Sequence, residues 1–92
     1  MAEYRDEYAI TFEKALSELN LDKKMKEMLK KAISFILEKP YVKAEGLEEY
    51  NNKLFRKNVC AGRLRVFYGI NQAQKIIRFH IIKFKNKNTY KT

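Results

Sequence analysis

The sequence has 92 residues, of which 46% are hydrophobic and 34% charged, and its net charge is +9. A chain of this length encloses one modest core, and its apolar content favours folding over disorder, so we predict a single domain over residues 1–92. No apolar run approaches the ~20 residues of a membrane helix and no secretory signal is evident, so we expect a cytoplasmic protein without a membrane partner.

The first predicted elements are a strand and a short helix. Tyr8-Ala9-Ile10-Thr11-Phe12 is rich in residues that favour strands. It leads directly into residues 13–19, where the apolar side chains have helical spacing. We therefore predict a strand that runs into a helix.

A second helix is predicted to follow at once. Asn20 or Asp22 is suited to cap its start. Apolar residues then recur every three or four positions from Met25 to Leu37. Pro40 is expected to end the helix, because proline lacks the backbone N–H that a helix interior requires.

The period changes from helix to strand after a connecting segment over residues 41–52. Three strands are predicted, at Leu54–Val59, Arg63–Ile70 and Lys75–Phe84. Short turns join them, so neighbouring strands are expected to be antiparallel. The order β-α-α-β-β-β predicts an α+β fold, in which a helical hairpin packs on an antiparallel sheet.

These last strands carry the positive charge. Residues 1–50 contain nine basic and eleven acidic residues, a net charge of −2, whereas residues 51–92 contain eleven basic residues and no carboxylate. Apolar residues are interleaved with these cations, so a folded positive surface is predicted. Solvated charges of a heat-stable protein would explain the helices but not this segment, because stabilising surface networks alternate in sign.

Alternation along the third predicted strand places its arginines away from the helices. Leu64, Val66, Tyr68 and Ile70 fall on one face, and Arg63, Arg65 and Phe67 fall on the other. Basic side chains from the neighbouring strands are expected to join the second face: Arg56, Arg78 and His80. Converging cations repel one another unless a polyanion lies between them, so RNA phosphate is the predicted ligand.

Cleavage of RNA at such a surface would have to use cationic or aromatic side chains. Residues 51–92 lack the carboxylates of a metal site, and the single Cys60 and His80 do not make a zinc site. Cys60 is interpreted as a loop or packing residue, and His80 as a packed or hydrogen-bonded one. No metal and no cofactor are expected. Arginine is suited to a bidentate clamp on the dianionic transition state.

Six stretches carry a likeness to a known family. They are Tyr8-Ala9-Ile10-Thr11-Phe12-Glu13-Lys14-Ala15-Leu16, Leu37-Glu38-Lys39-Pro40-Tyr41, Asn52-Lys53-Leu54-Phe55-Arg56, Gly62-Arg63-Leu64-Arg65-Val66-Phe67-Tyr68, Ile76-Ile77-Arg78-Phe79-His80-Ile81 and Tyr90-Lys91. In order and spacing they resemble the RelE/ParE toxin superfamily, and its RelE type in particular. The resemblance implies a RelE-like microbial ribonuclease fold and a toxin that cleaves messenger RNA in the ribosomal A site without metal. It also implies a RelB-like acidic antitoxin that wraps the toxin.

The resemblance also implies roles for individual residues. Arg65 matches the central strand arginine that stabilises the transition state, and Arg56 matches the first basic position on the preceding strand. Tyr90 matches the terminal tyrosine that stacks on the cleaved nucleotide. Further RNA contacts are expected from basic side chains around these three: Lys53, Lys57, Arg63, Arg78, Lys83 and Lys87.

The sequence departs from the family pattern at two places. The second basic position on the strand before the turn falls on Asn58, and Phe84-Lys85-Asn86 replaces the Gly-His-Arg that often follows the last strand. Lys85 is expected to stand in for the missing arginine, with weaker phosphate clamping because lysine is a point charge. Two alternatives stay open: a ParE-like toxin that inhibits DNA gyrase by binding, and a non-catalytic module that binds RNA or the ribosome.

Overall fold

The computed structural model describes residues 3–51 and 53–85. Its elements are β1 (Arg5–Tyr8), α1 (Ile10–Leu19), α2 (Lys23–Glu38), β2 (Glu45–Gly46), the 3-10 helix η1 (Glu48–Tyr50), β3 (Leu54–Val59), β4 (Leu64–Asn71) and β5 (Ile76–Phe84). The predicted α+β class and the order β-α-α-β-β-β are confirmed, with the two-residue β2 as an addition. None of the helices in the described ranges is long and apolar enough to cross a membrane.

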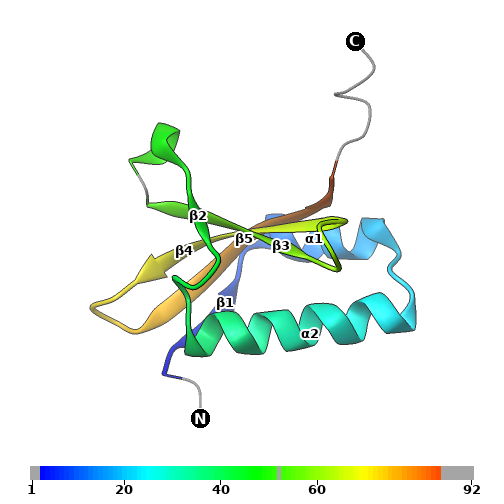
Figure 1. The fold of residues 1–92 in the computed structure, drawn as a ribbon, viewed down its shortest axis with the longest axis horizontal. Coiled ribbons are helices and arrows are strands. Elements are labelled where there is room, and N and C mark those ends of the chain that lie inside the picture. The colour runs from blue at the N-terminus through cyan, green and yellow to red at the C-terminus, as the bar shows by residue number, and fades with distance from the viewer. Residues whose placement is uncertain (1–2, 52, 86–92) are drawn as a thin grey trace.

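The strands form one five-stranded sheet in the order β1-β5-β4-β3-β2, which makes β4 the central strand. The predicted antiparallel pairing of β3 with β4 and of β4 with β5 is confirmed. The first strand instead pairs with β5 in parallel. Both helices contribute to the same core on one face of the sheet, and α2 runs beneath the sheet in Figure 1.

The predicted boundary between the first strand and helix is wrong. The strand ends at Tyr8 and the helix already begins at Ile10, so most of the predicted strand is helical. Local sequence preference does not decide this boundary. Tertiary contacts decide it, because the Ala9 amide donates to the Phe79 carbonyl and Phe12 is buried against the Phe79 ring. Packing thus overrides the weak preference of β-branched residues for strands.

The second helix begins and ends as predicted. Asp22 is its N-cap, and the side chain accepts a hydrogen bond of 2.8 Å from the Met25 amide. The helix ends at Glu38, two residues before Pro40. Asn20, the other candidate cap, ends α1 instead in the left-handed conformation, with φ of 55°. Leu29 and Ile36 are the buried residues of α2 and fix its packing against the sheet.

An aromatic cluster fills the centre of the core. The Tyr68 ring packs against Phe55 and Phe79, and the Phe79 ring also contacts Tyr8 and Phe12. The Tyr68 hydroxyl donates to the Pro40 carbonyl at 2.8 Å, which satisfies the buried polar group. Cys60 is buried beside this core, so its interpretation as a packing residue is confirmed.

Candidate nucleic-acid interface

The face of the sheet opposite the core presents a row of polar side chains across its three central strands. Arg65 on β4 is paired with Asn58 on β3 and with Lys83 on β5. Side chains of residues paired across a sheet lie on the same face. These three residues, which we call the Arg65 row, therefore project together from the face that α1 and α2 leave uncovered.

Arg65 is the least exposed residue of this row. Its side chain is half-buried between two neighbouring strands, whereas Asn58 and Lys83 are exposed. Its Nε atom is buried and has no hydrogen-bond partner in the described part of the chain. Each of the three ion pairs between described residues involves other side chains, so the charges of Arg65 and Lys83 are not neutralised by a carboxylate there. A buried donor and two unpaired cations fit an anionic ligand.

The next row along the strands adds an aromatic surface. Phe67 is paired with Arg56 on β3 and with Ile81 on β5. The Lys83 ammonium lies 5.2 Å from the centre of the Phe67 ring. Phe67 is half-buried, and an accessible aromatic ring next to cations is the arrangement on which unpaired bases stack. Sequence reasoning placed Phe67 on this face but missed this role, which its alternation with Arg65 would have indicated.

Arg63 and Lys85 lie at the end of the sheet beside the Arg65 row. The Lys85 amide donates to the Arg63 carbonyl at 2.9 Å, one position beyond the last pair of β4 and β5. Both side chains are exposed. The structure therefore places the Lys85 backbone next to that of Arg63, two positions from Arg65 on β4. Tyr90 and Lys87 lie outside the described residues.

Lys57 lies on the other face of the sheet, apart from these residues. It is paired with the buried Val66, and its ammonium group donates to the Val42 carbonyl at 3.3 Å. The same group lies 4.6 Å from the centre of the Phe35 ring. Burial lowers the pKa of Lys57, and the charge of Lys43 lowers it further. The Lys57 side chain therefore lies on the core face of the sheet and not on the open face with Arg65.

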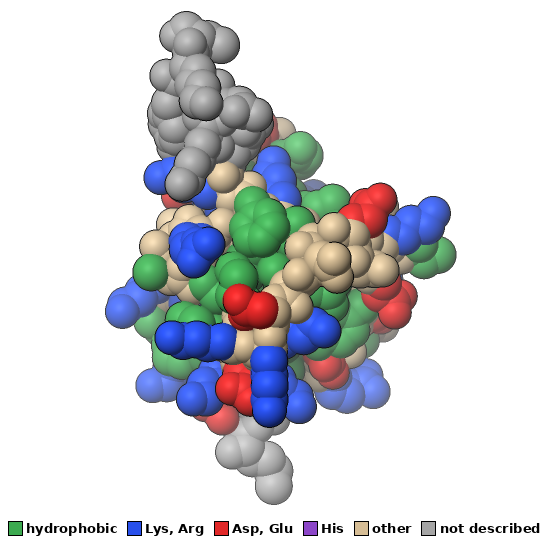
Figure 2. All heavy atoms as spheres, turned by 90° about the vertical axis from the view of Figure 1, so that its right-hand side faces the viewer, with side chains coloured by type: hydrophobic (Ala, Val, Ile, Leu, Met, Phe, Trp, Pro, Cys, Tyr) green, Lys and Arg blue, Asp and Glu red, His purple; other side chains and the backbone are tan. Residues whose placement is uncertain are grey.

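Carboxylates from the first half of the sequence reach the open face at its two sides. Glu45 on β2 forms an ion pair with Arg56, and Glu7 on β1 forms one with Arg78. Figure 2 shows the end of the molecule at the right of Figure 1, where both basic and acidic side chains appear between hydrophobic ones. The division of charge along the sequence therefore does not separate the surface into two halves, and the unneutralised cations lie at the centre of the sheet.

Lys53 and Arg78 lie on the open face at the other end of the strands. They line a hollow of about 240 Å³ together with Gly69 and His80. Gly69 follows Arg65 by four positions on β4, a distance of about 13 Å along a strand. Burial lowers the pKa of His80, and the charge of Arg78 lowers it further, so its neutral form dominates at pH 7.

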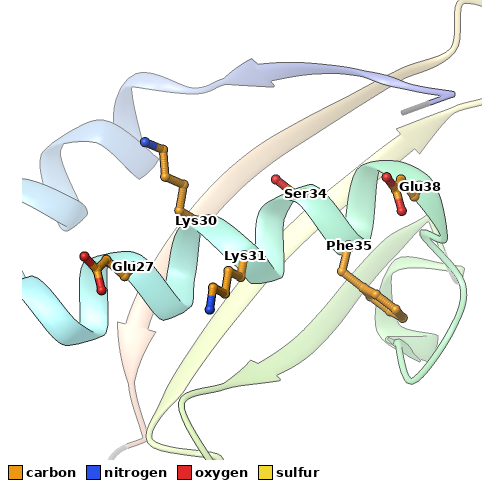
Figure 3. Close-up of a pocket in the computed structure, with 6 residues that line it drawn as sticks. All are labelled: Glu27, Lys30, Lys31, Ser34, Phe35 and Glu38. Atoms are coloured by element: carbon orange, nitrogen blue, oxygen red, sulfur yellow. The ribbon is translucent and has the colours of Figure 1, made fainter. Parts of the chain in front are cut away.

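A larger hollow lies along α2 and has a different character. Its volume is about 530 Å³, and all six lining residues belong to that helix: Glu27, Lys30, Lys31, Ser34, Phe35 and Glu38. In Figure 3 Lys31 and Phe35 point to one side of the helix, and Lys30 and Ser34 point to the other. Its charged groups are of both signs and point in different directions, so this hollow does not bring cations together as the Arg65 row does.

The fold is shared with solved structures of RelE toxins. No protein-family model and no curated protein matches the sequence. The RelBE2 toxin–antitoxin complex from Mycobacterium tuberculosis contains a chain that superposes with a TM-score of 0.73 at 14% identity, over 90% of this chain and 99% of that one. The archaeal RelE–RelB complex from Pyrococcus horikoshii gives 0.67 at 21% identity, over 92% and 98%. The isolated Escherichia coli RelE toxin gives 0.66 at 20% identity, over 96% and 92%. The predicted RelE-like fold is confirmed.

Proposed function

We propose that this chain, which has the fold of the RelE toxins, is the toxin of a toxin–antitoxin pair and cleaves messenger RNA in the ribosomal A site. The Arg65 row is the observation that carries the proposal. It places two cations without carboxylate partners and one amide side by side on the open face. A single-stranded RNA backbone that passes over the centre of the open face would meet all three groups.

The proposed chemistry is the attack of a 2′-hydroxyl group on the adjacent phosphate. This reaction needs a base for the hydroxyl proton, donors for the extra negative charge of the phosphorane and an acid for the departing 5′-oxygen. Arg65 supplies a forked donor for the phosphorane, because two parallel N–H bonds match two phosphate oxygens. The catalytic role of Arg65 is thus stabilisation of the transition state, not proton transfer, since its pKa exceeds ~12.

The neighbouring residues complete the proposed site. Lys85 contributes a point charge to the same phosphate, and Arg56 contacts the backbone one step further along the strands. Tyr90 is proposed to stack on the nucleotide at the cut, as its match to the terminal tyrosine of the family implies. The scheme uses no metal ion: residues 51–92 provide no carboxylate ligand, and Glu45 and Glu7 are paired with Arg56 and Arg78.

An acidic, RelB-like antitoxin is the proposed partner. The solved complexes from M. tuberculosis and P. horikoshii are assemblies of a toxin with its antitoxin. In this chain the cations of the Arg65 row need a negative partner when RNA is absent, because like charges at close range repel. An antitoxin segment rich in carboxylates would neutralise the row and block access of messenger RNA to it.

Cleavage in a translation extract tests the proposed function. The wild-type chain, Arg65→Ala and the control Lys24→Ala are each added with a reporter message, and primer extension maps the cut positions. Lys24 is exposed on α2, so its loss removes the same charge from the far side of the molecule. The expected result is a set of cuts in phase with codons for the wild type and the control, and none for Arg65→Ala.

Other outcomes would point to the alternatives. An intact message in a translation extract, together with inhibited DNA gyrase, would contradict the proposal and favour a ParE-like toxin. An intact message with tight binding to RNA or ribosomes would favour a non-catalytic binding module.

A further inference from the structure

The hollow around His80 is built by an irregularity in the pairing of β4 and β5. Phe67 is paired with Ile81, but the next residue, Tyr68, is paired with Phe79, so His80 is an extra residue in β5. Such a bulge redirects a side chain and is common beside functional sites. The imidazole consequently lies on the open face, over the neighbouring strand.

Gly69 leaves the space that the imidazole ring occupies. A Cβ atom at this position would lie 3.2 Å from His80 Nε2 and 3.5 Å from the Lys53 carbonyl oxygen. A methyl group there would be in tight contact with the ring, which would have to shift by a few tenths of an ångström. The backbone of β4 therefore forms the floor of a space of about 240 Å³, smaller than the pockets of ~300–1,000 Å³ that bind drug-sized ligands.

The groups around the hollow include both donors and acceptors. Lys53 and Arg78 are donors, and the Glu7 carboxylate is an acceptor that is paired with Arg78. The Asn71 side-chain amide is engaged with Gln74. Among the described residues no hydrogen bond is made by the His80 ring, so the neutral imidazole has one free donor and one free acceptor. A phosphate requires donors alone and would be repelled by Glu7. The edge of a nucleobase presents donors and acceptors together.

We propose that this hollow binds one unpaired nucleobase of the RNA, at a position flanking the phosphate held by Arg65. The proposal rests on the proposed function, because it needs RNA on the open face. Gly69 lies about 13 Å from Arg65 along β4, so an RNA chain that follows this strand from the Arg65 row reaches the hollow. Stacking on the imidazole and hydrogen bonds to the base edge would then make binding depend on the identity of that base.

Equilibrium binding to short single-stranded RNA tests this inference without requiring cleavage. Fluorescence anisotropy is measured for four labelled hexamers, of A, C, G or U only, at one fixed salt concentration. The wild-type chain is expected to prefer one base over the poorest by about 5- to 30-fold, the range for one or two well-formed base contacts. Arg65→Ala should weaken binding to all four RNAs alike and keep this preference.

Variants of the hollow should lose the preference and keep the general affinity. His80→Ala removes the imidazole and should bring the ratio close to one. Gly69→Ala shifts the ring without removing any functional group and should lower the ratio. Adding Gly69→Ala to His80→Ala should have little further effect, because the ring that the new methyl group meets is gone. Lys53→Gln should lower the preference, whereas Lys24→Gln, which removes an equal charge on α2, should not. Thermal unfolding of each variant verifies that it is folded.

The failures of the two proposals are distinguishable. Equal binding of the wild type to all four RNAs, or an unchanged preference in folded His80→Ala and Gly69→Ala, would overturn the nucleobase site and leave the proposed cleavage untouched. If the extract shows no codon-phased cleavage, the proposed cleavage is overturned. A base preference that depends on His80 would still support the nucleobase site. Absence of RNA binding altogether would overturn the site.

Discussion

The largely buried side chain of Lys57 shows how a single residue links charge to stability. It has the Val42 carbonyl and the Phe35 ring as partners, but it has lost most of its water. This loss lowers its pKa in the folded protein. Between the lowered value and the ordinary one near ~10.4, the unfolded chain binds more protons than the folded chain. The free energy of unfolding therefore rises with pH across that window.

Replacement of Lys57 by methionine is expected to stabilise the protein at neutral pH. Methionine keeps the apolar stem and removes the desolvated charge. Val42 is exposed, so water can replace Lys57 as the hydrogen-bond donor to its carbonyl. The midpoint of thermal unfolding should rise by about 4–8 °C for each kcal/mol gained. The rise in wild-type stability with increasing pH should also become smaller in Lys57→Met. Circular dichroism melts over a series of alkaline pH values measure both effects, with Lys24→Met as the exposed control. A lower midpoint at neutral pH would contradict this account.

Alternation along the strands predicts which face of the sheet a side chain lies on, wherever its charge and its place in the alternation indicate the same face. Leu64, Val66 and Tyr68 are fully buried, as their period of two requires, and Arg65 is on the open face. Periodicity also places Lys57 with Phe55 and Val59 on the core side, but its charge had favoured the RNA surface. The bulge at His80 could not be predicted, because an extra residue in a strand leaves no mark in an apolar sequence.

At the scale of elements, the start of α2 depends on one side chain. Asp22 accepts from the Met25 amide and so satisfies one of the free N–H groups of the first turn. Replacement by alanine should cost about 1 kcal/mol, within a range of ~0.5–2. We expect the unfolding midpoint of Asp22→Ala to fall by about 4–8 °C and that of Asp22→Asn, which keeps a capping oxygen, to change much less. Equal midpoints for Asp22→Ala and the wild type, measured by circular dichroism, would show that the cap contributes nothing.

The elements themselves differ in how well the sequence indicates them. The second helix and the last three strands have long periodic patterns and clear ends, and their predicted bounds agree with the structure to within two residues. β2 has only two residues and no pattern of its own, so it is defined by its pairing with Arg56 and Phe55. The start of α1 depends on contacts with Phe79, which is about 70 positions away in the sequence and thus invisible to local patterns.

For the whole molecule, the strand order decides which cations remain available. The outer strands β1 and β2 come from the acidic half of the sequence and bring Glu7 and Glu45 to Arg78 and Arg56. The central strands carry Arg65 and Lys83, beyond the reach of these two carboxylates in the described ion pairs. The fold thus concentrates the unneutralised positive charge in the middle of the open face. The order of charged residues in the sequence does not by itself indicate this position.

This arrangement predicts how RNA binding depends on salt. Each phosphate neutralised by the protein changes the slope of log affinity against log salt by about −0.7 for a single strand. The double variant Arg65→Ala/Lys83→Ala should therefore have a slope shallower by about 1.4. The double variant Lys24→Ala/Lys26→Ala removes the same charge from α2 and should keep the wild-type slope. Titrations of a labelled RNA at several salt concentrations measure the slopes, and equal slopes for the two double variants would contradict a binding site at the Arg65 row.

The rate of a single turnover on ribosomes tests the central claim most directly. Purified ribosomes stalled with a defined codon in the A site are mixed with excess protein, and the cleavage of the message is followed over time. Removal of one donor to a developing oxyanion typically slows a reaction by ~100- to 1,000-fold, and we predict a loss of that size for Arg65→Ala, with Lys24→Ala at the wild-type rate. Cleavage by Arg65→Ala at the wild-type rate would contradict a catalytic site at the Arg65 row.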